Sequence, residues 1–427
     1  MQLPKISVFL LALLLAAVAM VPIVSAVDSV TAANQDLIEL NDISVETAQE
    51  HATITLLSMI QTGALDSNWA GAKINPAPQE IFDVNGGRLF YLFSVEKKGE
   101  RVGEIYAAAS KVLGAPVITI GSINEPDTAE KMQKHTQNVL EGKYSGYQKL
   151  SEKIVCFDYP VLGSMISLQN IRTAKVKTVI IDSRDGSEKN LDTQVSSFYN
   201  QFSADVMKNN VVNWEETNVV MEAQKEKLLK ENPEILTNYS DLDADQLMKS
   251  LTNSKTNEIS YLTKLDPDGM RILSGLTHYT QYYADWCGVA TAQIISSKYM
   301  SPPWGQYHIG QMMGAYFPDG TPGQGTNIND ELAYYQPTVA EGGLGKPSSD
   351  WEPSMTSTWE NAKAEIEQFR PLKIGRVYPT AHARACNGWQ VTGGNRYLLF
   401  YDPASYGSVY WEYVSPGFTY SNFVYVR

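Results

Sequence analysis

Aromatic residues are unevenly distributed along this chain, and their concentration toward one end limits how it can fold. The segment from Ser260 onward is less than half of the chain, yet it holds 28 of the 44 aromatics and six of the eight tryptophans. Aromatic side chains bury large apolar areas, so this part is expected to pack as a domain of its own. The whole chain has 427 residues, more than one hydrophobic core usually organises. Because 43% of its residues are hydrophobic and 19% charged, we expect the remainder to fold as well.

The segment from Met1 to Ala26 has the pattern of a signal peptide. Lys5 precedes the apolar run Ile6–Met20, and Val24–Ala26 offers the small residues after which signal peptidase cuts. An uncleaved membrane anchor is the alternative, but the run is shorter than the ~20 apolar residues that a span needs. The sequence therefore predicts a mature chain that begins near Val27 and works outside the cell, secreted or at the cell surface. Its net charge of -13 argues against nucleic acid, or a membrane after signal removal, as a partner.

Residues 27–190 are predicted to form an α+β domain. The expected elements are a helix that Ser44 caps, a β-hairpin, a polar helix and two further β-type stretches. Their ranges are Ser44–Ile60, Arg88–Val95 with Arg101–Ala108, Thr128–Lys153, and Lys153–Leu168 with Ala174–Ile181.

Residues 191–258 change character and are predicted to be a charged helical linker. Glu215–Glu231 and Leu242–Leu251 are rich in charged, helix-forming residues and are separated by Asn232-Pro233. Few apolar residues there could anchor a core, which is typical of solvated helices. Exposed backbone of this kind is where a protease cuts most easily.

The chemistry is expected in residues 259–427. Cys287 comes directly before Val289–Lys298, which has the pattern of a buried helix. The unpaired N–H groups and the dipole at a helix N-terminus favour a thiolate. The sequence therefore predicts a reactive cysteine at Cys287.

A histidine and an aspartate are expected close to that cysteine. The segment from Ala381 to Val391 alternates as a strand, and the residues after the Gly393-Gly394 turn run back as a second strand to Tyr401. His382 begins the first strand and Asp402 follows the second, so an antiparallel hairpin brings the two together. Packed on the Cys287 helix, this hairpin would form a Cys-His-Asp triad.

These motifs resemble those of the papain-like cysteine peptidases, and most closely the peptidase C39-like family. The resemblance rests on Gln281, Cys287-Gly288, His382 and Asp402-Pro403. It implies that Cys287 is the nucleophile, His382 the general base and acid, Asp402 the group that orients the imidazole, and Gln281 the side-chain donor of the oxyanion hole. The strands between residues 75 and 122 more faintly resemble the propeptides of streptopain-type peptidases.

The resemblance has departures. The spacing from Cys287 to His382 is shorter than the ~130–150 residues of the papain group proper, which favours the C39-like branch. His382 lacks the glycine often found before it, and Cys386 stands where an aliphatic residue is usual.

Taken together, the sequence predicts a secreted cysteine peptidase with an α+β, papain-like catalytic domain behind a smaller α+β prodomain. It would be made as a zymogen, with a protein or peptide as substrate and its own N-terminal domain as inhibitor. The chemistry needs no cofactor, and no metal-ligand spacing is present. The alternatives are a cell-wall peptide amidase or transpeptidase with the same triad, and a non-catalytic surface-binding protein.

The remaining cysteines and histidines are assigned structural or surface roles. Cys156 and Cys386 are expected to be buried thiols. His51 and His135 are expected at the surface, and His278 and His308 are expected in structural positions.

Overall fold

A computed structural model of the chain describes residues 32–66, 68–122, 128–159, 161–191, 195, 197–231, 269–353, 358–376, 381–404, 408–414 and 420–427. The predicted signal peptide and residues 232–258 of the predicted linker lie outside these residues. We refer to residues 32–231 as the N-terminal part and to residues 269–427 as the C-terminal part.

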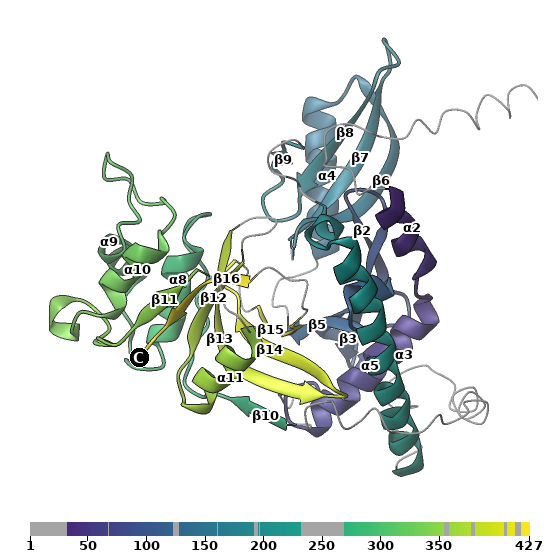
Figure 1. Cartoon of the computed structure of the whole chain (residues 1–427). Helices are drawn as coiled ribbons and strands as arrows, with labels where there is room; N and C mark the ends of the chain where they lie inside the picture. Colours follow the sequence, from purple (N-terminus) through teal and green to yellow (C-terminus); the bar gives the residue numbers. More distant parts are fainter. Residues whose placement is uncertain are drawn as a thin grey trace, which may run out of the picture.

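The N-terminal part contains helices together with short and long strands (Figure 1). Its helices are α2 (Ala32–Leu40), α3 (Val45–Gln61), α4 (Thr128–Lys143) and α5 (Ala204–Glu231), with 3-10 turns η1 (Lys111–Leu113) and η2 (Phe198–Gln201). Its strands are β1 (Lys73–Ile74), β2 (Gln79–Asp83), β3 (Arg88–Lys97), β4 (Glu100–Ala108), β5 (Val117–Ser122), β6 (Tyr147–Asp158), β7 (Val161–Asn170), β8 (Val176–Asp182) and β9 (Glu188–Lys189).

The C-terminal part places its helices around the opposite end of the sheet (Figure 1). Its helices are α8 (Cys287–Ser296), α9 (Gln306–Met312), α10 (Ile328–Tyr335) and α11 (Thr358–Glu367), with the turn η4 (Val339–Glu341). Its strands are β10 (Gly269–Ile272), β11 (Asp350–Glu352), β12 (Leu372–Arg376), β13 (His382–Thr392), β14 (Asn395–Tyr401), β15 (Val409–Tyr413) and β16 (Tyr420–Tyr425).

The described strands form one large, mostly antiparallel sheet that runs through both parts. Its order is β11-β16-β12-β13-β14-β15-β5-β4-β3-β2-β6-β7-β8-β9, with β10 paired to β13 and β1 to β3. The two parts join where β15 pairs with β5, with Val409 opposite Ser122 and Glu412 opposite Thr119. The prediction of a mixed α+β fold is confirmed.

Two local predictions are confirmed, the cap of a helix and a β-hairpin. Both depend on residues that are close together in the sequence. The Ser44 side chain caps α3 by accepting a hydrogen bond from the Thr47 amide at 3.2 Å. Strands β3 and β4 form the predicted hairpin, with Lys98 and Gly99 in the left-handed conformation of its turn.

The predicted helix over residues 128–153 is wrong beyond Lys143. Helix α4 ends at Lys143, and β6 begins at Tyr147. The first half of β6 is exposed on both faces. Its sequence therefore does not need the alternation of apolar and polar residues by which a half-buried strand is recognised. Backbone pairing with β7 makes this polar segment a strand.

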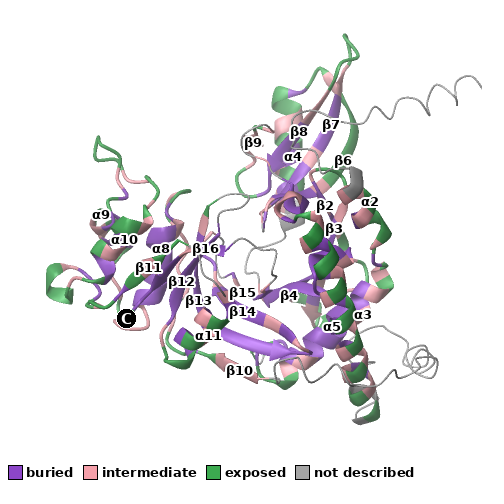
Figure 2. Ribbon diagram, viewed as in Figure 1, coloured by how far each residue is buried: buried purple, intermediate pink, exposed green. Residues whose placement is uncertain are grey.

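Helix α5, part of the predicted linker, buries one face. Met207, Trp214 and Met221 recur at a heptad spacing and are 0%, 3% and 2% exposed. The helix lies against α3 and η1, where the Asn210 side chain donates to the Val112 carbonyl at 2.9 Å. Figure 2 shows much of its outer face exposed. The regular spacing of these large side chains is the signal for this packing.

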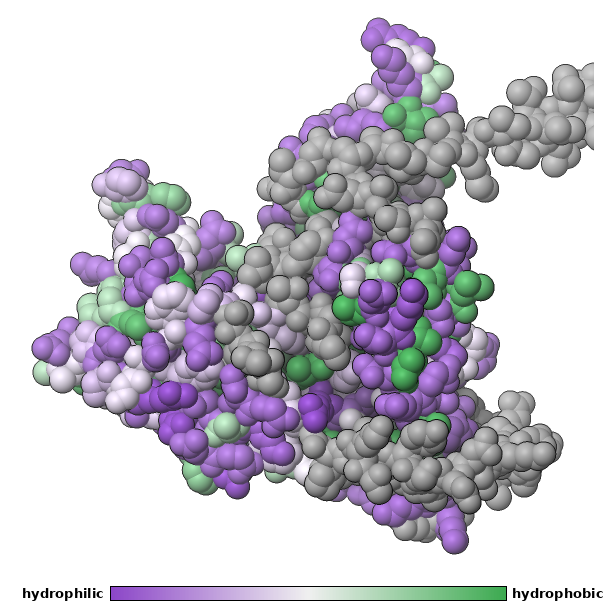
Figure 3. All heavy atoms as spheres, in the orientation of Figure 1, coloured by the Kyte–Doolittle hydropathy of each residue, from purple (hydrophilic) through white to green (hydrophobic). Residues whose placement is uncertain are grey.

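The two faces of β13 carry different helices. Ala385 belongs to the core cluster that contains the apolar residues of α8, whereas Cys386 belongs to the cluster that contains Trp359 and Ile366 of α11. Since neighbouring residues of a strand point to opposite faces, α8 and α11 cover opposite sides of the sheet. In the view of Figure 3, hydrophilic side chains dominate the outer surface.

Candidate active site

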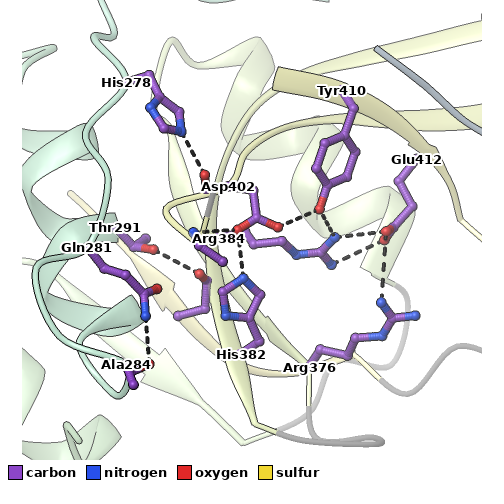
Figure 4. A network of polar contacts seen from close by, with 12 residues as sticks. His278, Gln281, Ala284, Thr291, Arg376, His382, Arg384, Asp402, Tyr410 and Glu412 are labelled. Atoms are coloured by element: carbon purple, nitrogen blue, oxygen red, sulfur yellow. Dashed lines mark hydrogen bonds and ion pairs between the residues drawn. The ribbon is translucent and has the colours of Figure 1, made fainter. Parts of the chain in front are cut away.

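Helix α8 begins at Cys287, as the sequence predicts, and two contacts fix its position. Trp286, at the N-cap, is fully buried and donates its indole N–H to the Ala315 carbonyl at 3.1 Å. Thr291, one turn along the helix, donates its hydroxyl to the carbonyl of Ala383 on β13 at 3.1 Å (Figure 4). The helix N-terminus is thereby held beside the first residues of β13.

His382 and Asp402 meet as predicted from the hairpin. Strands β13 and β14 pair antiparallel, with Ala385 opposite Tyr401. The His382 Nε2 atom lies 2.8 Å from Asp402 Oδ1 (Figure 4), and the two side chains are 17% and 3% exposed. With Nε2 bonded to the carboxylate, Nδ1 is the ring nitrogen left for the thiol of Cys287.

The surroundings of Cys287 favour its thiolate. Burial would raise the pKa of the thiol, but the hydrogen bond to His382 and the charge of that ring lower it below its ordinary value. The Ala383 amide and the Lys373 ammonium act in the same direction. Lys373 is itself buried and forms an ion pair with Glu331 at 2.5 Å.

The pKa values of the other two groups are displaced toward an ion pair. Burial would lower the pKa of His382, but the Asp402 carboxylate and the bond to Cys287 raise it. Burial would raise the pKa of Asp402, but His382 and then Arg384 hold it well below its usual range. These shifts favour an imidazolium between a thiolate and a carboxylate over the neutral imidazole and thiol.

Gln281, predicted as the oxyanion donor, uses its amide hydrogens within its own loop. Its Nε2 donates to the carbonyls of Tyr283 at 3.0 Å and Ala284 at 2.6 Å. Its Oε1 is buried without a hydrogen-bond partner. To donate to a bound carbonyl, the amide group would have to leave these loop carbonyls.

Behind Asp402 lies a buried polar network that the sequence analysis missed. Tyr410 on β15 donates its hydroxyl to Asp402 Oδ2 at 2.8 Å, and Arg384 on β13 donates to that hydroxyl at 3.0 Å (Figure 4). Glu412 on β15 pairs with Arg384. The sequence did contain a signal for this network. Arg384 and Glu412 carry opposite charges on strands whose pattern predicts burial, and buried charges are usually paired.

The triad opens into a cavity of about 790 Å³ that both parts of the chain line. The C-terminal part contributes Cys287 and His382, and the N-terminal part contributes Tyr159 and Arg184. A ligand in this cavity would therefore lie between the triad and the N-terminal part.

The other cysteines and histidines have the following positions. Cys156 and Cys386 are buried and free, as predicted. His278 bonds the Asp402 carbonyl at 2.6 Å, and His308 bonds the Gly342 carbonyl at 2.7 Å, so both have structural contacts. The prediction of a surface position is wrong for His51, which is 2% exposed, because α5 covers this face of α3.

Within the part of the chain that the structure describes, no cluster of three or more His, Cys, Asp or Glu side chains is arranged to hold a metal ion. None of the described helices has the length and apolar character to span a bilayer. The chain matches no protein-family model, and no curated protein is significantly similar to it in sequence.

Proposed function

We propose that this protein is a cysteine-type peptidase that hydrolyses peptide bonds through Cys287, His382 and Asp402. One arrangement carries the proposal: Cys287, at the N-terminus of α8, and His382 line the same cavity, His382 lowers the pKa of the Cys287 thiol, and the Nε2 atom of His382 lies 2.8 Å from the buried Asp402. Nucleophile, base and orienting group thus follow one another in the order that acyl transfer requires.

Each group has a definite task in this reaction. The Cys287 thiolate attacks the peptide carbonyl, and the His382 imidazolium gives its proton to the departing amine, which leaves an acyl-enzyme. The backbone N–H of Cys287 would stabilise the oxyanion, together with Gln281 if its amide turns toward the cleft. His382 then takes a proton from water, the hydroxide releases the acyl group as a carboxylic acid, and the thiol is restored.

The protein would act outside the cell and would be made as a precursor. The signal-like segment from Met1 to Ala26 supports export. The N-terminal part, which lines the cavity at Tyr159 and Arg184, would narrow access to Cys287, and the precursor would be processed by a cut between residues 232 and 268.

The test compares the full chain with Cys287→Ala and His382→Ala on a mixture of unstructured peptides, with products identified by mass spectrometry. Wild type should cut peptides, and each variant should lose turnover, because neither nucleophile nor base can be replaced. A thiol-directed epoxide should label Cys287 in wild type. Cys156→Ala is the matched control, since it removes a buried thiol and leaves the triad intact.

The outcomes separate the alternatives. Labelling of Cys287 without peptide cleavage would contradict a general peptidase and favour the cell-wall amidase or transpeptidase. A Cys287 that the epoxide cannot label would contradict both enzymes and favour a surface-binding protein.

A further inference from the structure

The side of Asp402 that faces away from His382 is held by a directed hydrogen bond. Asp402 Oδ1 faces His382 and also accepts a hydrogen bond from the Ala404 amide at 2.9 Å, and the Tyr410 hydroxyl donates to Oδ2 at 2.8 Å. Arg384 Nη1 donates to the same hydroxyl at 3.0 Å. A guanidinium can only donate, so the hydroxyl oxygen accepts from Arg384 and its own proton is directed at Asp402.

Arg384 is in turn fixed by Glu412. The two form a bidentate pair with distances of 2.8 and 3.1 Å, and they are 1% and 0% exposed. The Tyr420 hydroxyl donates to Glu412 at 3.0 Å, and the guanidinium lies over the Phe400 ring at 4.0 Å from its centre. Burying such a pair costs desolvation and is weak evidence of stabilisation, whereas the bidentate geometry fixes direction.

The N-terminal part holds the strand that carries Tyr410 and Glu412. On β15 these residues lie opposite Gly121 and Thr119 of β5. A Cβ atom on Gly121 would collide with the Cβ of Tyr410, so the two strands meet more closely here than any side chain at Gly121 would permit. The position of Tyr410 therefore depends on β5.

We propose that Tyr410, oriented by Arg384 and Glu412, is a positioning residue that keeps Asp402 behind His382. We further propose that β5 of the N-terminal part sets its position. The inference deepens the proposed function and rests on it in taking Cys287, His382 and Asp402 as the reacting set. It makes the N-terminal part a support of the triad.

Tyr410→Phe in the full chain tests this proposal. Without the hydroxyl, the freed Arg384 N–H group attracts Asp402 Oδ2, so the carboxylate moves away from His382 and stabilises the imidazolium less. Labelling of Cys287 with iodoacetate reads the imidazolium, because this anion approaches a positive ring more readily. The upper limb of the pH profile is the range at high pH where the labelling rate falls because the imidazolium loses its proton. Its midpoint should move down by about half a pH unit or more. Peptide turnover should fall about tenfold or more, with KM within about twofold.

Tyr413→Phe is the matched control. Tyr413 is a buried tyrosine on the same strand, on the other face, where its hydroxyl donates to the Gly114 carbonyl at 3.4 Å. Its removal should leave the labelling profile and kcat unchanged. An upper limb that stays in place or moves up in Tyr410→Phe would overturn the proposal, since Asp402 would then have kept its place without the hydroxyl. Wild type that labels normally but cuts no peptide would contradict only the proposed function.

Gly121→Ala tests the contribution of β5. The added methyl group, whose nearest neighbours would be Tyr410 and Val409, pushes β5 from β15 at Tyr410. The upper limb should therefore move in the same direction as in Tyr410→Phe. Gly142→Ala on α4 is its control, because a Cβ there meets nothing within 4 Å. Equal profiles for these two variants would overturn the role of β5.

Discussion

At the residue scale, the meeting of His382 with Asp402 was predictable from the sequence, whereas the residues around the candidate site were not. The helix signal after Cys287 and the hairpin signal around Gly393-Gly394 are local in the sequence, and they suffice to bring His382 to Asp402 at 2.8 Å. Lys373 also acts on the thiol, but its position depends on how β12 pairs with β13. Such registers depend on long-range packing, which no spacing in the sequence reveals.

The pKa shifts at this site predict an unusual pH dependence. Because the pKa of Cys287 is lowered and that of His382 is raised, the thiolate and imidazolium coexist between the two values. Alkylation of Cys287 by neutral iodoacetamide should therefore already be fast near pH ~6. Mass spectrometry of the labelled peptide measures it, with Cys287→Ala as the control. A rate that rises only above pH ~8, as for an ordinary thiol, would contradict the ion pair.

At the scale of elements, helices and hairpins with their own end signals were predictable, and elements defined by distant partners were not. Ser44 marks the start of α3, and the turn at Lys98 and Gly99 marks a hairpin. By contrast, the polar start of β6 has no strand pattern and is fixed by β7. The face of α3 around His51 is closed by α5, a helix that comes much later in the chain.

The contact between α3 and α5 should loosen in mild acid. His51 bonds Asn218 at 2.7 Å, and burial lowers its pKa to about 4. The unfolded chain takes up a proton near the ordinary pKa of about 6.5, whereas the folded chain does so only near 4, so stability falls as pH drops through this window. This shift corresponds to about 3 kcal/mol. Urea unfolding at several pH values measures the free energy of unfolding, which should fall less steeply with decreasing pH in His51→Gln than in wild type. An equal dependence on pH in the two proteins would refute the assignment.

At the scale of the whole molecule, the sheet joins two parts that the sequence presents as separate. The change in aromatic content near Ser260 predicts a boundary, but composition does not tell whether two domains share a sheet. Trp411 of the C-terminal part donates to the Ala64 carbonyl at 3.0 Å, and Tyr397 donates to the Val117 carbonyl at 3.1 Å. One core cluster includes residues of both parts. A cut in the chain would leave this shared sheet and core in place, so processing of the precursor would not by itself release the N-terminal part.

A cut between residues 232 and 268 should therefore leave the two parts associated. The cut can come from the enzyme itself or from a specific protease site introduced there in Cys287→Ala. Because β5 pairs with β15 and the parts share a core, both pieces should elute together in size-exclusion chromatography, at the volume of the uncut chain. They should separate only in denaturant, since a buried interface of this kind is lost when the sheet unfolds. Two separate peaks under native conditions would show that the N-terminal part is a releasable prodomain, and its contacts with β15 would then belong to the precursor alone.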